Sequence, residues 1–275
     1  MSYIAGGGAY NWPNWPCTHH LPPRRVSACG SGALPVPLHT ILLTDPEAKN
    51  CREKATAILV RESTISADDI SQAKNLKAIG KQGVGIEIIN QEACAKRNNW
   101  ILNTPGANAQ SVAELVLSLT MAVARQLRPI AVRQAAGEEV RKKYCSAITL
   151  QGKTIGIVGM GNIGFAVGRI FRGVLNSPIY AYDPLAVKDA WSDLERTRVD
   201  NFEDMLPYAD FQMMKNAILI NAARGGIVNE DDLIQVLNNG TLYVAGLDCH
   251  EEPPTLQRYQ RLWDTGRAIS TPHIG

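Results

Sequence analysis

The chain has 275 residues, of which 45% are hydrophobic, and this length suits one large or two medium-sized globular domains. Its 28 basic and 26 acidic residues give a formal charge of +2 and are spread along the sequence without a basic tract. This balance argues against a nucleic-acid-binding or membrane-surface protein, and it favours a small molecule as the partner.

Two features of the sequence indicate the cellular compartment. The N-terminal residues MSYIAGGGAY lack the basic and apolar regions of a signal peptide, and no apolar run reaches the roughly 18 residues that span a bilayer. The six cysteines are widely spaced and form no C-x-x-C pair. We therefore expect a cytoplasmic protein with reduced thiols. Cys17, His19 and His20 lie together in a Pro-rich stretch, where such a group is more often incidental than metal-binding, so we expect no metal.

Apolar runs in chain order predict alternating strands and helices. Residues 1–37 are rich in Gly, Pro and Trp without a regular period, so we expect irregular structure there. Residues 55–63 have the pattern of a buried strand, residues 67–72 that of a helix, and residues 76–85 that of a second strand ending in a glycine turn. Strand, helix and strand in this order indicate an α/β unit with parallel strands.

A long helix is predicted within residues 103–127. This stretch combines a Pro105-Gly106 break with a Ser111-x-x-Glu114 pattern typical of a capping box, and about four turns of apolar-rich helix follow. We expect a buried connecting helix here, with a domain boundary near its start.

A glycine-rich turn follows the next predicted strand, TIGIV, and an apolar helix pattern follows the turn. The turn has G-x-G-x-x-G spacing and consists of Gly159, Met160, Gly161, Asn162, Ile163 and Gly164. Gly159 would permit a tight turn, Gly161 would let backbone N–H groups approach a pyrophosphate, and Gly164 would allow close packing of helix on strand. Asn162 and Ile163 open the helix and belong to the same candidate cofactor site.

The strand PIYAY ends at Asp183, about 20 residues after the glycine turn. A carboxylate there can accept both ribose hydroxyls of NAD, and it would repel the extra phosphate of NADP. The alternative is that Asp183-Pro184 is only a turn after a strand. The glycine pattern at the correct distance favours the cofactor interpretation, with NAD as the cofactor.

Six stretches in a fixed order resemble the D-isomer-specific 2-hydroxyacid dehydrogenase family, in its 3-phosphoglycerate dehydrogenase-like branch. They are KAIGKQGVG, NTPGANAQSVAE, GKTIGIVGMGNIG, ILINAARGGIVNEDDL, AGLDCHEEPP and TPHIG, and the resemblance covers residues 45–275. It implies an α/β fold in which a partial flavodoxin-like substrate domain precedes a Rossmann-like NAD-binding domain. We assign residues 1–37 to an irregular segment, 38–108 to the substrate domain and 109–275 to the NAD domain. The resemblance further implies an active site in the cleft between the domains, and a homodimer.

The same resemblance implies hydride transfer between C2 of a small 2-hydroxy or 2-keto acid and C4 of the nicotinamide. His273 in TPHIG would exchange the hydroxyl proton, and Glu252 would hold the imidazole and raise its pKa. Arg224 in AARGG would bind the substrate carboxylate and the C2 oxygen through its planar fork. Alone, each would more often be a loop histidine or a surface arginine, but together they favour catalysis.

Four residues of the substrate domain complete the predicted substrate site. By resemblance, Val84 and Gly85 would offer backbone N–H groups to the substrate carboxylate. Arg61 and Lys81 match basic positions that face the phosphate in phosphoglycerate dehydrogenases, which makes a second acidic group on the substrate plausible. An equal alternative is that both are ordinary surface residues.

Further cofactor contacts are implied around the catalytic residues. Ala223 and Asp248 would lie beside the NAD, with Asp248 near its nicotinamide end, together with Arg224 and His273.

The sequence departs from the family pattern in several places. The family has a strand and a helix after Ala209–Phe211, but here Phe211 is followed at once by QMMKNAILIN. Roughly twenty residues of the βα repeat are absent, which predicts a gap inside the sheet. Residues 1–44 lack the expected apolar strand and helix, and the family's helix after His273 is absent. The chain is one residue short between Asp248 and Glu252, which leaves Glu251 as an alternative to Glu252.

Two rival hypotheses follow from these observations. Because the family includes transcriptional co-repressors that bind NAD, the chain could be a non-enzymatic binding protein. The missing segments favour a second rival, an inactive member of the family. Within the dehydrogenase hypothesis, the sequence does not name the substrate beyond a 2-hydroxy acid.

Overall fold

The computed structural model of the protein describes residues 2–6, 39–42, 52–61, 63–145, 147–208, 217–251 and 256–275, with residues 2–6, 39–42 and 52 described by their backbone only. The chain divides into two compact units, Met1–Ala107 and Asn108–Gly275. Each unit has buried apolar clusters of its own.

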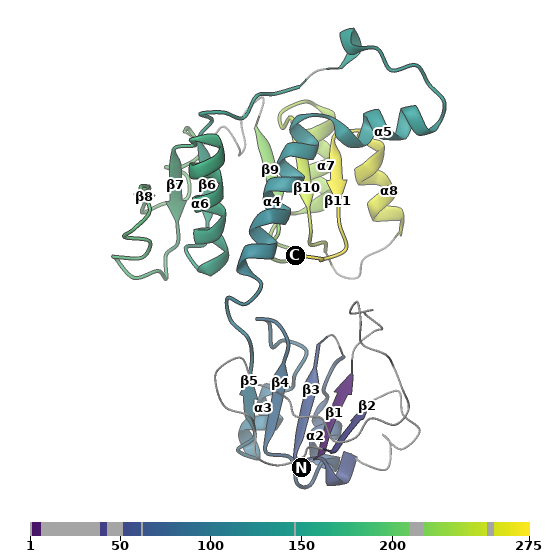
Figure 1. Cartoon of the computed structure of the whole chain (residues 1–275), viewed down its shortest axis with the longest axis vertical. Coiled ribbons are helices and arrows are strands. Elements are labelled where there is room, and N and C mark those ends of the chain that lie inside the picture. The colour runs from purple at the N-terminus through teal and green to yellow at the C-terminus, as the bar shows by residue number, and fades with distance from the viewer. Residues whose placement is uncertain are drawn as a thin grey trace. The chain divides into compact units, whose positions relative to one another are not determined.

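The first unit is built on a parallel sheet whose order in the described residues is β2-β1-β3-β4-β5. The strands are β1 (Ser2–Gly6), β2 (His39–Leu42), β3 (Ala57–Val60), β4 (Ala78–Lys81) and β5 (Trp100–Leu102). The helices are the short 3-10 helix η1 (Arg52–Lys54), α2 (Ala67–Gln72) and α3 (Gln91–Lys96). This strand order is that of flavodoxin-like sheets, so the predicted fold class is confirmed (Figure 1).

The prediction of irregular structure over residues 1–37 is wrong for residues 2–6, which form β1 between β2 and β3. A first strand of the substrate domain is therefore present where the sequence indicated none. Tyr3 pairs with Ala57, more than fifty residues along the chain, and such a distant partner leaves no local signal in the sequence. Residues 7–37 lie outside the described residues.

Helix α2 has the predicted bounds, and polar groups cap both of its ends. Ser66 and Asp69 form a capping box at its N-terminus. At its C-terminus the guanidinium of Arg97 donates hydrogen bonds to the carbonyl oxygens of Ile70, Ser71, Ala73 and Lys74. These bonds satisfy carbonyls that the helix itself leaves without partners, and they join α3 to α2.

The second unit contains two separate three-stranded parallel sheets in the described residues, β6-β7-β8 and β9-β10-β11. Its strands are β6 (Ile155–Val158), β7 (Ile179–Tyr182), β8 (Thr197–Val199), β9 (Ile218–Asn221), β10 (Val244–Leu247) and β11 (Ala268–Ser270). Its helices are α4 (Ala109–Ala124), α5 (Leu127–Ala135), η2 (Lys142–Tyr144), α6 (Asn162–Leu175), α7 (Glu230–Asn238) and α8 (Leu256–Asp264).

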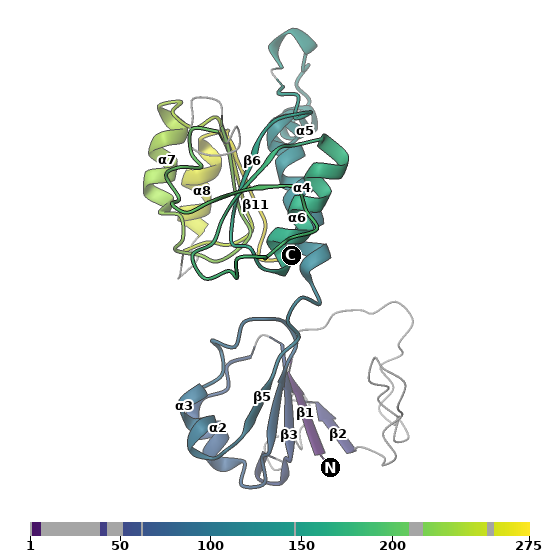
Figure 2. The ribbon, with the colours of Figure 1, turned by 90° about the vertical axis from the view of Figure 1, so that its left-hand side faces the viewer.

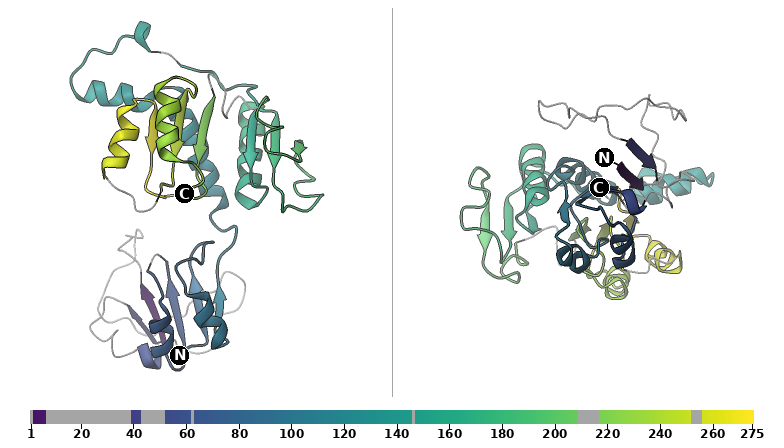
Figure 3. Two further views of the ribbon diagram at one scale, coloured as in Figure 1. Left: turned by 180° about the vertical axis from the view of Figure 1, so that it is seen from behind. Right: turned by 90° about the horizontal axis from the view of Figure 1, so that it is seen from below.

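Strands β6 and β9 each have one strand neighbour among the described residues, so each is an edge. Residues 209–216, between β8 and β9, lie outside the described residues, so the predicted gap in the sheet stays a prediction. Figure 3 shows the separation of the two sheets from behind. Buried residues from both sheets, including Ile155 and Ile218, nevertheless belong to one apolar cluster with residues of α4.

Helix α4 is the buried connecting helix that the sequence predicted, and it packs on α6, β9, β10 and β11. Figure 2 shows α4 and α6 on one side of the strands and α7 and α8 on the other. The predicted capping box is wrong, because the helix begins at Ala109 and Ser111 lies inside its first turn. The Ser111 hydroxyl donates to the Asn108 carbonyl, and Glu114 accepts from Gln110 instead of reaching back.

No single helix in the described part of the chain is both long and apolar enough to cross a membrane. Helices α4 and α5 pass that test only when taken together, and they are bent by 65° relative to each other.

Candidate active site

The glycine-rich turn joins β6 to α6 in the predicted strand-turn-helix arrangement. Gly159 has φ +98°, a conformation that side chains rarely adopt. A Cβ atom at Gly164 would overlap the carbonyl oxygen of Gly159 and lie 2.9 Å from the Trp191 ring. At Gly161, the N-cap of α6, a Cβ atom would meet nothing within 4 Å. The turn therefore needs glycine at 159 and 164 for its own structure, whereas Gly161 borders open space.

That open space suits a phosphate group. The first-turn N–H groups of α6, which begins at Asn162 and Ile163, have no partners within the helix, and α6 has no side-chain cap at its N-terminus. Exposed amides at the positive end of a helix dipole bind anions. The residues present thus fit the pyrophosphate of a dinucleotide.

Asp183 lies at the end of β7 and bonds to the glycine turn. Its Oδ2 accepts a hydrogen bond from the Met160 N–H at 2.8 Å, and its Oδ1 accepts from the N–H groups of Leu185 at 2.8 Å and Ala186 at 3.1 Å. The bond from Met160, followed by that from Leu185, holds the pKa of this carboxyl below its ordinary value. An ionised Asp183 remains available to ribose hydroxyls only through its unused lone pairs, so it has a structural role that the sequence did not indicate.

Arg224 lies in a loop that a buried asparagine holds in shape. Asn221, at the end of β9, donates from Nδ2 to the Arg224 carbonyl at 3.0 Å and accepts at Oδ1 from the Ala223 N–H at 3.1 Å. The Arg224 side chain is exposed, and one of its Nη atoms donates to the Ala223 carbonyl. Asn221 thus fixes the backbone just before and just after the Cα atom of Arg224.

His273 lies in a loop that a buried carboxylate holds. Asp248, 1% exposed at the end of β10, accepts hydrogen bonds from the Thr271 hydroxyl at 2.6 Å and from the N–H groups of Ile274 at 3.0 Å and Gly275 at 3.1 Å. His273 is exposed and has φ +57°, an uncommon conformation for a residue with a side chain. Strained backbone of this kind recurs at functional sites.

Three neighbouring strands bring these groups together. The N–H of Asp248 donates to the Asn221 carbonyl at 2.8 Å, and the N–H of Thr271 donates to the Leu247 carbonyl at 2.9 Å. The carboxyl ends of β9, β10 and β11 therefore carry the loops of Arg224, Asp248 and His273 along one edge of the sheet. In open α/β sheets, ligands bind at this edge.

The proposed partner of His273 cannot be placed in the same way. Glu252 lies outside the described residues. The alternative, Glu251, is engaged elsewhere, since its Oε1 accepts from the Glu230 N–H at 3.3 Å and its Oε2 lies 3.2 Å from Nη1 of Arg258.

The predicted substrate residues of the first unit lie at the carboxyl edge of its own sheet. Arg61 follows β3 and Lys81 ends the neighbouring β4, where Val60 pairs with Lys81. The Lys81 Nζ donates to the Gln82 carbonyl at 2.6 Å. Neither basic side chain is more than partly exposed.

The glycine loop beside them is tied to the chain after β5. Thr104 exchanges hydrogen bonds with Gly83, and Asn103 donates from Nδ2 to the Val84 carbonyl at 2.8 Å. Within the described residues, no acceptor takes up the N–H groups of Val84 and Gly85. These amides remain open to a carboxylate.

No group of three His, Cys, Asp or Glu residues suited to a metal occurs in the parts that the structure describes. The Cys17, His19 and His20 group lies outside them.

The comparison with known families decides what this site belongs to. Residues 117–213 and 203–275 match the family described as D-isomer specific 2-hydroxyacid dehydrogenase, NAD binding domain. The chain belongs to the D-isomer-specific 2-hydroxyacid dehydrogenase family. The two matched segments overlap at residues 203–213, close to the point where a strand and a helix of the family pattern are predicted to be absent. The cofactor of the matched domain is NAD, and the glycine turn that fits a pyrophosphate lies inside it.

Named relatives agree with this membership. The chain is 34% identical over 241 residues to hydroxypyruvate reductase of Thermotoga maritima, covering 79% of this chain and 77% of that protein. It is 32% identical over 255 residues to D-3-phosphoglycerate dehydrogenase of Methanocaldococcus jannaschii, covering 85% of this chain and 48% of that protein. The chain therefore spans about half the length of this phosphoglycerate dehydrogenase.

Solved structures show the same fold. The TT0316 protein of Thermus thermophilus superimposes with a TM-score of 0.74 at 28% identity, over 86% of this chain and 83% of that one.

Sequence reasoning found the motifs but missed the residues that hold them. Asn221, Thr271 and the anchoring carboxylate of Asp248 bond to groups that are distant in the sequence. Asn221 alone had a local signal, because it closes the apolar run AILIN.

Proposed function

We propose that this chain is an NAD-dependent oxidoreductase that interconverts a small D-2-hydroxy acid and its 2-keto acid. The observation that carries the proposal is the edge formed by β9, β10 and β11, where Asp248 anchors the His273 loop beside the Arg224 loop. The named relatives are dehydrogenases and a reductase, which favours catalysis over the co-repressor-like and inactive alternatives.

The chemistry assigns one task to each group. Bound NAD supplies or accepts the hydride. His273 accepts the proton of the C2 hydroxyl during oxidation and returns it during reduction, since imidazole titrates near neutral pH. Arg224 binds the carboxylate and polarises the C2 oxygen through a planar fork that lysine cannot reproduce. Glu252 holds the imidazole and stabilises its charged form.

Cofactor recognition follows from the geometry of the glycine turn. Gly161, Asn162 and Ile163 place backbone amides at the pyrophosphate, Gly159 and Gly164 shape the turn, and Asp183 accepts from the ribose. Ala223 and Asp248 lie beside the nicotinamide end, with Arg224 and His273.

The substrate class follows from the first unit. The amides of Val84 and Gly85, which have no acceptor among the described residues, suit a carboxylate. The basic side chains Arg61 and Lys81 suit a second acidic group such as a phosphate. Hydroxypyruvate, which the name of one relative gives as its substrate, is the 2-keto acid to test first.

The assembly we propose is a homodimer that pairs through α5. This helix buries none of its own residues, and Leu127 and Val132 are more than half exposed on it. Exposed apolar side chains of this kind are stabilised when a second copy covers them. Sedimentation of the purified chain, compared with Val132→Glu, tests this assembly.

A cytoplasmic location accompanies the proposal. The three cysteines of the described part of the chain, Cys94, Cys145 and Cys249, are all free thiols, which suits a reducing compartment.

A titration with NADH, followed by an assay with hydroxypyruvate, tests the function. Gly161→Ala should weaken NADH binding at least tenfold, because its Cβ projects into the space assigned to the pyrophosphate. Gly173→Ala is the matched control, since a Cβ there also meets nothing within 4 Å and lies near the other end of α6. Equal NADH affinity in the two variants would contradict the cofactor site. Turnover retained in His273→Ala would contradict the catalytic assignment.

A further inference from the structure

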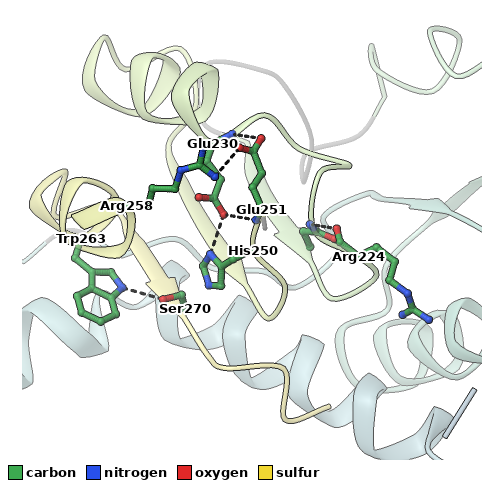
Figure 4. A network of polar contacts seen from close by, with 8 residues as sticks. Arg224, Glu230, His250, Glu251, Arg258, Trp263 and Ser270 are labelled. Atoms are coloured by element: carbon green, nitrogen blue, oxygen red, sulfur yellow. Dashed lines mark hydrogen bonds and ion pairs between the residues drawn. The ribbon is translucent and has the colours of Figure 1, made fainter. Parts of the chain in front are cut away.

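A buried cluster beside the catalytic edge is not explained by the proposed roles. Glu230, the first residue of α7, is 6% exposed, and the side chain of His250, just after β10, is also 6% exposed. Their Oε1 and Nδ1 atoms are 2.9 Å apart (Figure 4). In the tautomer that carries its proton on Nδ1, the imidazole donates to Oε1 of Glu230.

Two reciprocal hydrogen bonds also link the backbone at Glu230 to the backbone at Glu251. The Glu251 N–H donates to Oε1 of Glu230 at 3.1 Å, and the Glu230 N–H donates to Oε1 of Glu251 at 3.3 Å. Two carboxylates this close repel each other. His250 faces one of them, and Arg258 of α8 lies 3.2 Å from the other. Together these contacts fix the chain after β10 to the start of α7.

The Arg224 loop is part of the same arrangement. A Cβ atom at Gly225 would overlap the carbonyl oxygen of His250, so the backbone that follows Arg224 packs directly against His250. A shift of His250 would therefore displace the residues before Glu252 and the residues after Arg224 at the same time.

Packing alone does not account for a histidine at this position. Its Nε2 is buried without a hydrogen-bond partner in the described residues, and the ring stands edge-on to Tyr259 at 4.5 Å between centroids. An unsatisfied buried nitrogen destabilises the fold, and a phenylalanine of similar shape would avoid that cost. The bond from Nδ1 to Glu230 is what the histidine supplies and phenylalanine cannot.

We propose that His250 and Glu230 form a latch that positions the chain up to Glu251 beside the Arg224 loop. Both are positioning residues, and the latch commits Glu251 to a structural role, which leaves Glu252 as the partner of His273. The latch itself is argued from contacts alone. Only its expected effect on turnover rests on the proposed function.

Hydrogen exchange at the Glu251 amide tests the latch without any turnover. His250→Phe and Glu230→Gln should each accelerate exchange at least tenfold, whereas His250→Asn, which keeps an N–H donor, should restore most of the protection. Asp231→Asn is the matched control, because Asp231 is the next residue of α7 and pairs with Arg261 at the surface. Unchanged exchange in His250→Phe, or equal acceleration in Asp231→Asn, would overturn the proposal.

Two further measurements distinguish a failure of the latch from a failure of the proposed function. The imidazole ¹⁵N spectrum should show His250 protonated at Nδ1 in the parent chain, and an unprotonated Nδ1 would overturn the latch. If the parent reduces hydroxypyruvate, His250→Phe should lower kcat at least tenfold with NADH affinity within twofold of the parent. A parent without turnover would refute the proposed function, while the exchange and ¹⁵N results would still decide the latch.

Discussion

The carboxylate of Asp183 accepts a hydrogen bond from the backbone N–H of Met160 at 2.8 Å, which joins the end of β7 to the middle of the glycine turn after β6. The main-chain N–H of Gly159 donates to the Tyr182 carbonyl at the same place. The turn is thus held in shape by the protein itself, and the residue predicted to bind the ribose also preorganises the turn that is proposed to bind the pyrophosphate.

Replacing Asp183 by Asn should weaken both the fold and cofactor binding. A hydrogen bond to a charged acceptor contributes about 1.5–3 kcal/mol, and the amide keeps only part of it. Because hydrogen bonds lower the pKa of Asp183 below its ordinary value of 3.8, its contribution is present above that value and is lost as the pH falls through the folded-state pKa. Urea unfolding of both chains between pH 2 and 7 measures this difference. A difference that stays constant at low pH would contradict the assignment.

Replacing Gly164 by Ala should destabilise the second unit by about 1–3 kcal/mol, because overpacking forces the backbone or a neighbouring ring to move. The added Cβ would overlap the Gly159 carbonyl and approach the Trp191 ring, which is itself buried. Thermal unfolding monitored by tryptophan fluorescence measures the loss. Gly161→Ala is the control, because a Cβ atom there meets no protein atom within 4 Å. An equal loss of stability in that variant would contradict this account.

The sequence predicted the elements whose signals are local. Helix α2 has a capping residue and an apolar face within a few positions, and β6 runs directly into its glycine turn, so both were predicted correctly. Strand β1 was missed because its apolar stretch is short and its neighbour β3 follows a long intervening segment. The pattern Ser111-x-x-Glu114 misplaced a helix start, because the preceding Pro-Gly break allows the helix to begin at Ala109.

The candidate site likewise has features with a local signal in the sequence and features without one. Motif matches assigned Arg224, Asp248 and His273 to one site, and the structure has them in the loops that follow β9, β10 and β11. The bonds that hold these loops, such as that from Thr271 to Asp248, join residues more than twenty positions apart. Such bonds depend on the register of β10 with β11, which one sequence does not reveal.

Replacing Thr271 by Val should loosen the His273 loop. The substitution keeps the shape of the side chain but removes the hydroxyl that donates to the buried Asp248 carboxylate at 2.6 Å, and such a loss costs about 1–3 kcal/mol. We expect lower stability and a reduced kcat, since the proton-transfer group is less well placed. Thr271→Ser retains the hydroxyl and is the control. If the two variants unfold at the same urea concentration, the hydroxyl has no anchoring role.

Cys249 should make stability fall at alkaline pH. Burial, together with the adjacent Asp248, raises the pKa of its thiol from 9.0 to about 11. A raised folded-state pKa means that the contribution is complete below pH 9 and is lost as the pH rises toward 11, a loss on the order of 2–3 kcal/mol. Because lysines and tyrosines titrate in the same range, the measurement is the difference in unfolding free energy between the parent and Cys249→Ser.

The same burial predicts that iodoacetamide at pH 8 labels the less buried Cys145 but spares Cys249 until urea unfolds the chain. Equal labelling of the two thiols in the native protein would show that Cys249 is accessible, and the alkaline loss would then have another origin.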